Sequence, residues 1–75
     1  MNKNVDDDII IEVLGKTGKP VKKSIHDIDI NCMVKRNLKT GMFEPFISRW
    51  YRLPGEFSDP IKAFRVIQEF QKKYL

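Results

Sequence analysis

The chain has little of the chemistry on which secreted domains and many enzymes depend. Of its 75 residues, only Cys32 is a cysteine and only His26 is a histidine. A single cysteine excludes an internal disulfide, so we expect a reducing, cytoplasmic setting. No apolar run approaches the ~20 residues that a membrane span needs, and we expect no membrane partner. The first residues also lack the apolar stretch of a secretion signal.

Length and composition predict one small globular domain. Hydrophobic residues make up 41% of the chain and charged residues 32%, a balance typical of folded rather than disordered proteins. A domain of this size buries only about 60% of the surface that its unfolded chain exposes, so its core is small. We expect residues 1–8 to be a flexible acidic lead and residues 9–75 to form the domain.

Three segments have the patterns of β-strands. Residues 9–14 form a short apolar run, whose continuity predicts either burial on both sides or a crowded position in the sheet. Residues 15–20 are dense in turn formers and predict a hairpin loop. Residues 21–35 contain a period-two alternation that predicts one buried face, made of Ile28, Ile30, Cys32 and Val34. A turn at residues 37–41, with Gly41 free to adopt positive φ, precedes a third strand over residues 42–53.

The third expected strand alternates imperfectly. One face would hold Arg49 together with an apolar set, Phe43, Ile47, Tyr51 and Leu53. The other face would hold Phe46 and Trp50. Either a bulge near Pro45 shifts the register, or both faces are partly covered. The pattern leaves both explanations open.

The last third of the chain predicts a capped amphipathic helix. Pro60 suits the first helical position, and Asp59 can cap it, with Ser58 as the alternative cap. Ala63 would allow close approach to the sheet. Apolar residues at three- and four-residue spacing predict one buried face, made of Ile61, Phe64, Ile67, Phe70 or Gln71, and Tyr74. The predicted fold is α+β, a three-stranded antiparallel sheet packed on one face by a single C-terminal helix (βββα).

Positive charge is concentrated in the middle of the chain. The net charge is +4, and residues 16–55 carry nine Lys/Arg against three acids. Clustered cations attract polyanions over a Debye length of about 8–10 Å, although many basic surfaces only aid solubility. Because one helix can cover only one face of a sheet, we expect the function on the open face and its basic turns.

Candidate catalytic and metal sites fail on geometry. On a strand, Asp27 and Asp29 would point one way and His26 the other, so the three would not converge on a metal. Cys32 would lie on the core face with no assured base beside it. The loop at residues 15–19 lacks the spacing of a phosphate-binding loop, although its lysines would reach phosphates as point charges. We therefore expect no enzyme, no metal and no cofactor.

The best functional signal lies in residues 48–52. Arg49 and Arg52 flank Trp50 and Tyr51 there. Arginine grips phosphates or reads guanine edges, and aromatic rings stack on bases. The alternative is that the two aromatic residues belong to the core and the arginine stems cover them. The sequence does not decide which face Trp50 occupies.

The layout of residues 33–74 resembles a family of small DNA-binding modules. Residues 34–41 (VKRNLKTG) resemble a strand and Gly-containing turn, and residues 55–63 (GEFSDPIKA) resemble a helix start with Ala63 at a small position. Modules of this kind are the arm-binding N-terminal domains of tyrosine-type integrases and the related plant AP2 domains. The resemblance implies that an open sheet face enters a major groove while the helix packs behind it.

Together these patterns predict a nucleic-acid-binding module from a mobile-element or phage-like context, with DNA or RNA as its partner. By position, the resemblance implies contacts at Lys35, Arg36, Lys39, Arg49 and Arg52, and the aromatic residue Trp50 between the two arginines completes the set of residues expected to bind. The alternative is a small protein-interaction or inhibitor module, including a homodimer, that binds no nucleic acid.

Overall fold

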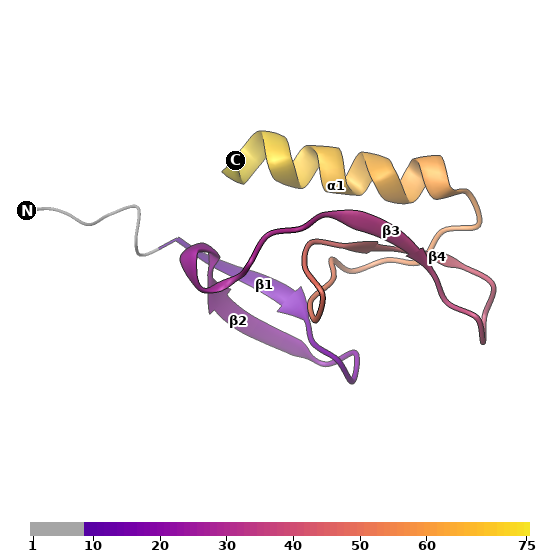
Figure 1. Cartoon of the computed structure of the whole chain (residues 1–75), viewed down its shortest axis with the longest axis horizontal. Helices are drawn as coiled ribbons and strands as arrows, with labels where there is room; N and C mark the ends of the chain where they lie inside the picture. Colours follow the sequence, from indigo (N-terminus) through magenta and orange to yellow (C-terminus); the bar gives the residue numbers. More distant parts are fainter. Residues whose placement is uncertain (1–8) are drawn as a thin grey trace, which may run out of the picture.

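The computed structural model describes residues 9–75, so the expected acidic lead at residues 1–8 lies outside the described residues. The fold is α+β, as the sequence predicts, with antiparallel strand pairs and one C-terminal helix (Figure 1). Its elements in chain order are β1 (Ile10–Leu14), β2 (Pro20–Ser24), the 3₁₀ turn η2 (Ile25–Asp27), β3 (Met33–Arg36), β4 (Phe43–Phe46) and α1 (Pro60–Tyr74). The expectation of a single three-stranded sheet is wrong, because the strands form two separate two-stranded sheets, β1–β2 and β3–β4.

The first hairpin pairs β1 with β2, with Val13 opposite Val21. Gly18 has a φ of 84° in the connecting turn, a conformation that glycine adopts without a Cβ clash. Burial alternates along β1: Ile11 and Val13 are buried, whereas Ile10 is 57% exposed. Of the two expectations for this strand, burial on both sides is therefore wrong, because only one face of the hairpin is covered.

The second expected strand is broken in the middle. β2 ends at Ser24, whose hydroxyl accepts a hydrogen bond from the His26 N–H at 3.3 Å and starts η2. Residues 28–32 then run without strand pairing, and pairing resumes at β3. The alternation is still visible in burial, since Ile28 is buried and Asp29 is exposed. The pattern thus predicted which side chains face the core, but not which segments pair.

The third expected strand is wrong as one continuous element. β4 ends at Phe46, and the chain reverses through residues 47–51, where the Ile47 N–H donates to the Tyr51 carbonyl at 3.1 Å. The returning segment runs back beside β4 through single bridges, Phe46 with Arg52 and Phe43 with Phe57. Neither a bulge at Pro45 nor two covered faces explains the imperfect alternation, because the segment is a strand followed by its own return.

Arg52 joins the two hairpins through its backbone. It bridges Phe46 of β4 on one side and Leu14 of β1 on the other. Its N–H donates to the Leu14 carbonyl at 3.0 Å, and the Leu14 N–H donates to the Arg52 carbonyl at 2.8 Å. The β1–β2 turn and the β3–β4 hairpin are therefore held next to one another.

The helix begins where the sequence predicts. The Asp59 carboxylate caps it by accepting from the Ile61 N–H at 2.9 Å, and Pro60 occupies the first turn. Its buried residues are Ala63, Ile67 and Phe70. The predicted buried face is wrong at its start, where Ile61 is 60% and Phe64 is 48% exposed. At about 100° per residue, Ile61 lies some 120° around the helix from Ile67, outside the buried stripe.

α1 covers one face of the β3–β4 hairpin and leaves the other open (Figure 1). In the core, Phe70 of α1 belongs to one cluster with Ile47 and Leu53, and with Val13 of the first hairpin. Strand residues alternate between faces, so Lys35 and Glu44, which are paired across the hairpin, share the face opposite Val34 and Pro45. That open face and the β1–β2 turn enclose the site described next.

Candidate functional site

A basic cleft of about 570 Å³ lies between the two hairpins. Three parts of the chain form it: the β1–β2 turn, the open face of β3–β4 with its turn, and residues 49–52, which follow β4 closely. Its lining residues are Gly15, Lys16, Thr17, Gly18, Lys35, Asn37, Lys39, Glu44, Phe46, Arg49, Trp50 and Arg52. The cleft exists because the backbone bridge between Leu14 and Arg52 brings the first turn against the second hairpin.

The cleft gathers most of the residues that the sequence singled out. Five of the six expected binding residues line it: Lys35, Lys39, Arg49, Trp50 and Arg52. The sixth, Arg36, lies elsewhere, with its guanidinium carbon 5.9 Å from the centre of the Phe43 ring. Arg36 directly follows Lys35 in β3, and because consecutive strand residues point to opposite faces, it lies on the other face of the hairpin.

Lys16 and Phe46 complete the cleft and were not among the expected binding residues. The Lys16 ammonium lies 4.7 Å from the centre of the Trp50 ring, although 34 positions separate the two residues. The Lys35 ammonium lies 4.4 Å from the centre of the Phe46 ring. The sequence predicts that lysines of this turn reach phosphates, and only the contact between the hairpins places Lys16 at this site.

Trp50 is held at the rim by the tight turn of residues 47–51. Ser48 is 4% exposed, and its hydroxyl accepts from the N–H groups of Trp50 at 3.3 Å and Tyr51 at 3.1 Å. A serine hydroxyl that bonds nearby backbone groups fixes a local turn in this way. Trp50 is 51% exposed. Trp50 therefore belongs to the accessible surface and not to the core.

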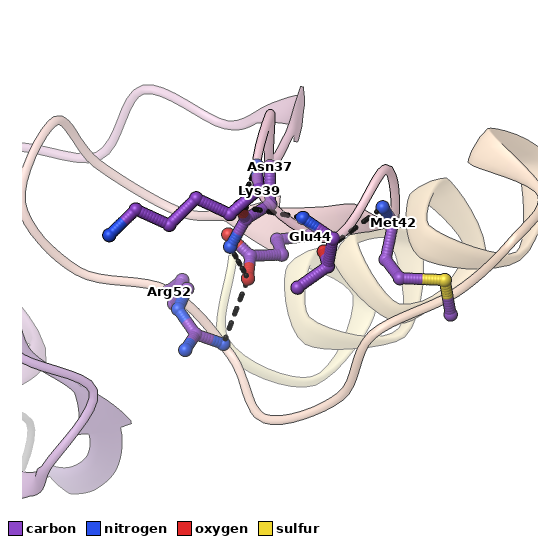
Figure 2. Close-up of polar contacts among 6 residues, drawn as sticks. Asn37, Lys39, Met42, Glu44 and Arg52 are labelled. Atoms are coloured by element: carbon purple, nitrogen blue, oxygen red, sulfur yellow. Dashed lines mark hydrogen bonds and ion pairs between the residues drawn. The ribbon is translucent and has the colours of Figure 1, made fainter.

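A small polar network positions Arg52 (Figure 2). The side-chain oxygen Oδ1 of Asn37 accepts from the backbone N–H of Lys39 at 2.9 Å and so organises the β3–β4 turn. Its amide donates to the Glu44 carboxylate at 3.3 Å, and the same carboxylate lies 3.9 Å from the Arg52 guanidinium. Glu44 is 6% exposed and thus sits below the cleft surface.

The electrostatic character of the cleft is positive. Lys16, Lys35, Lys39, Arg49 and Arg52 line it against one carboxylate, that of Glu44. That carboxylate is buried and already engaged by Asn37 and Arg52. Charges of one sign that line a cleft with low-dielectric walls concentrate their electric field inside the cleft. The arrangement suits an anion of extended shape.

The other candidates from the sequence remain apart from this cleft. Within residues 9–75, no three His, Cys, Asp or Glu side chains come together to hold a metal ion. Cys32 is half-buried, and burial raises the pKa of its thiol, while a hydrogen bond with the Gln71 side chain acts in the opposite direction. Residues 15–19 form a hairpin turn closed by the Gly15 N–H and the Lys19 carbonyl at 2.9 Å.

Comparisons with family models, with curated proteins and with solved structures find no match to this chain. Among residues 9–75, no helix is long and apolar enough to cross a membrane.

Proposed function

We propose that this chain is a nucleic-acid-binding module that holds a sugar-phosphate backbone in its basic cleft. One observation carries the proposal: the β1–β2 turn brings Lys16 to the cations of residues 35–52, and all of them line one cleft beside a tryptophan that is 51% exposed. Phosphate contacts by lysine and arginine supply most of the affinity of such proteins. An exposed aromatic ring next to them offers a stacking surface for a base.

The binding mode differs from the one that the resemblance to AP2-like modules implies. Those modules present a flat three-stranded face to a major groove, and this fold has two hairpins with a cleft between them. The contacts we propose are Lys16, Lys35, Lys39, Arg49, Trp50 and Arg52. Arg36 is left out because it lies over the Phe43 ring.

The experiment is a titration of DNA and RNA oligonucleotides, single-stranded and duplex, at several salt concentrations. The parent is compared with the double variant Arg49→Ala/Arg52→Ala. A matched control, Lys62→Ala/Arg65→Ala, removes the same charge from exposed positions on α1 that do not line the cleft. The cleft variant should bind at least ~10-fold more weakly, and its salt slope should be smaller by about 1.4–1.8, the value for two lost phosphate contacts.

The control variant should lose much less affinity, because its charges lie away from the bound backbone. The proposal fails if the parent binds none of these nucleic acids. It also fails if the two double variants behave alike, since the cleft would then have no role beyond net charge.

A second candidate function is a small protein-interaction module. It is favoured by apolar side chains at the start of α1, where Ile61 and Phe64 are both exposed. Sedimentation velocity over a range of concentrations separates the two candidates. A tight dimer that ignores nucleic acid favours protein interaction, and a monomer that binds oligonucleotides favours the basic cleft.

A further inference from the structure

A second hollow, of about 500 Å³, shares two residues with the basic cleft. Arg49 and Trp50 line both spaces, so they form a common wall between them. The remaining lining residues of this hollow are Asp27, Ile28, Asp29, Asn31, Ser48 and Tyr51. Its volume falls within the range of pockets that hold small organic groups, about 300–1,000 Å³.

The hollow is less positive than the cleft, because it holds two carboxylates against one cation, Arg49, whose guanidinium carbon lies 5.8 Å from the centre of the Trp50 ring. Asp27 and Asp29 bring two exposed carboxylates, which make no ion pair or hydrogen bond within residues 9–75. The side chains of Trp50 and Tyr51 bring aromatic rings. Carboxylates repel phosphate, so a bound backbone would stay on the cleft side. A nucleobase, in contrast, presents a flat π-face to an aromatic wall and N–H donors to a carboxylate.

Resting on the proposed function, we infer that the ligand is a single-stranded nucleic acid, with its backbone in the basic cleft and one base turned over Trp50 into the second hollow. In a duplex the base would be stacked and its pairing edge occupied, so it would have to leave the helix to reach Asp27 and Asp29. Guanine suits the site best, because its N1–H and amino group lie side by side and can both donate to one carboxylate. Thymine has no amino group to offer.

The test uses fluorescently labelled twelve-nucleotide strands of thymidine in which only one central position changes. That position holds guanine, inosine or thymine, and the guanine strand is also tested as a duplex and as its RNA counterpart. We expect the guanine strand to bind about 5-fold or more tighter than the thymine strand, the effect of one good edge contact. Inosine keeps N1–H but lacks the amino group, so its affinity should fall in between. The duplex should bind more weakly than the single strand.

Two double variants identify the carboxylates responsible. Asp27→Asn/Asp29→Asn keeps the shape of both side chains but replaces one acceptor oxygen of each carboxylate with an NH2 donor, so neither can accept both the N1–H and the amino group of guanine. Glu56→Gln/Glu69→Gln removes the same charge from exposed positions that line neither space. Both variants should bind the thymine strand more tightly, because each loses negative charge. Only the Asp27/Asp29 variant should lose the preference for guanine over thymine.

The outcomes separate this inference from the proposed function. If the parent binds single strands equally well whatever the central base, or prefers the duplex, the inference is wrong and the basic cleft stands. The inference is also wrong if the aspartate variant keeps the full guanine preference. If the parent binds no nucleic acid at all, both the inference and the proposed function are wrong.

Discussion

Arg52 and Leu14 exchange two backbone hydrogen bonds, at 2.8 and 3.0 Å, and these bonds join the two hairpins of the domain. The side chain of the same arginine lies in the basic cleft, 3.9 Å from Glu44. The backbone of Arg52 therefore holds the two hairpins together, and its guanidinium adds a positive charge to the cleft between them. Because the backbone bonds do not depend on the side chain, the two roles can be separated by mutation.

The ion pair between Arg52 and Glu44 should contribute measurably to stability. Both side chains are largely buried, with relative exposures of 18% and 8%. A double-mutant cycle with Arg52→Met and Glu44→Gln, measured by urea unfolding, should give a coupling energy of about 1 kcal/mol. Each single variant should still fold, since the bonds to Leu14 remain. If the effects of the two substitutions are additive, the two side chains lie close together without stabilising the fold through their ion pair.

Ser48 should control the placement of Trp50. Ser48→Ala removes the acceptor of the Trp50 and Tyr51 N–H groups, and we expect a loss of about 1–2 kcal/mol in unfolding free energy. The fluorescence anisotropy of the single tryptophan should also fall, because the indole gains freedom. Ser58→Ala, at an exposed position, is the control and should change stability by less than about 0.5 kcal/mol. Equal effects of the two substitutions would contradict this role.

Truncation of two isoleucines of α1 should lower the free energy of unfolding by very different amounts. Ile67 is 1% exposed and Ile61 is 60% exposed. Ile67→Ala should cost about 2–5 kcal/mol, a large share of the stability of so small a domain. Ile61→Ala should change stability by no more than about 0.5 kcal/mol. Urea unfolding decides the matter, and a similar cost at both positions would mean that the helix packs through the face the sequence predicted.

Features of the fold that depend on neighbouring residues could be predicted from the sequence, and features that depend on distant segments could not. The helix start was predictable because Asp59 and Pro60 act locally, within one turn of the chain. The burial of Ile28 and the exposure of Asp29 followed from alternation, which is also local. Strand pairing was not predictable in the same way, because it depends on which distant segment offers a partner.

The site shows the same division between local and distant signals. Arg49, Trp50 and Arg52 were found because they lie within four residues of one another. Lys16 joins them only through the bridge between Leu14 and Arg52, which no local pattern encodes. Arg36 lies outside the cleft because consecutive residues of β3 point to opposite faces, and Lys35 points into the cleft.

Cys32 should react slowly with alkylating reagents in the folded protein. Burial raises the pKa of its thiol, so at neutral pH a smaller fraction is the reactive thiolate than in the unfolded chain. The rate of modification by iodoacetamide at pH 7.5 should therefore rise when urea unfolds the domain, beyond the effect of urea on a free thiol. A rate as fast as that of an unfolded peptide would show that the thiol is not shielded.

The most direct test of the basic cleft uses Trp50 itself, since it is the only tryptophan in the chain. A thymidine-rich single strand with one central guanine is titrated into the unlabelled protein while tryptophan emission is followed at low and high salt. Stacking and nearby phosphates should quench the emission to a plateau, and added salt should restore it. Emission that stays constant through a large excess of the strand at low salt would contradict the account.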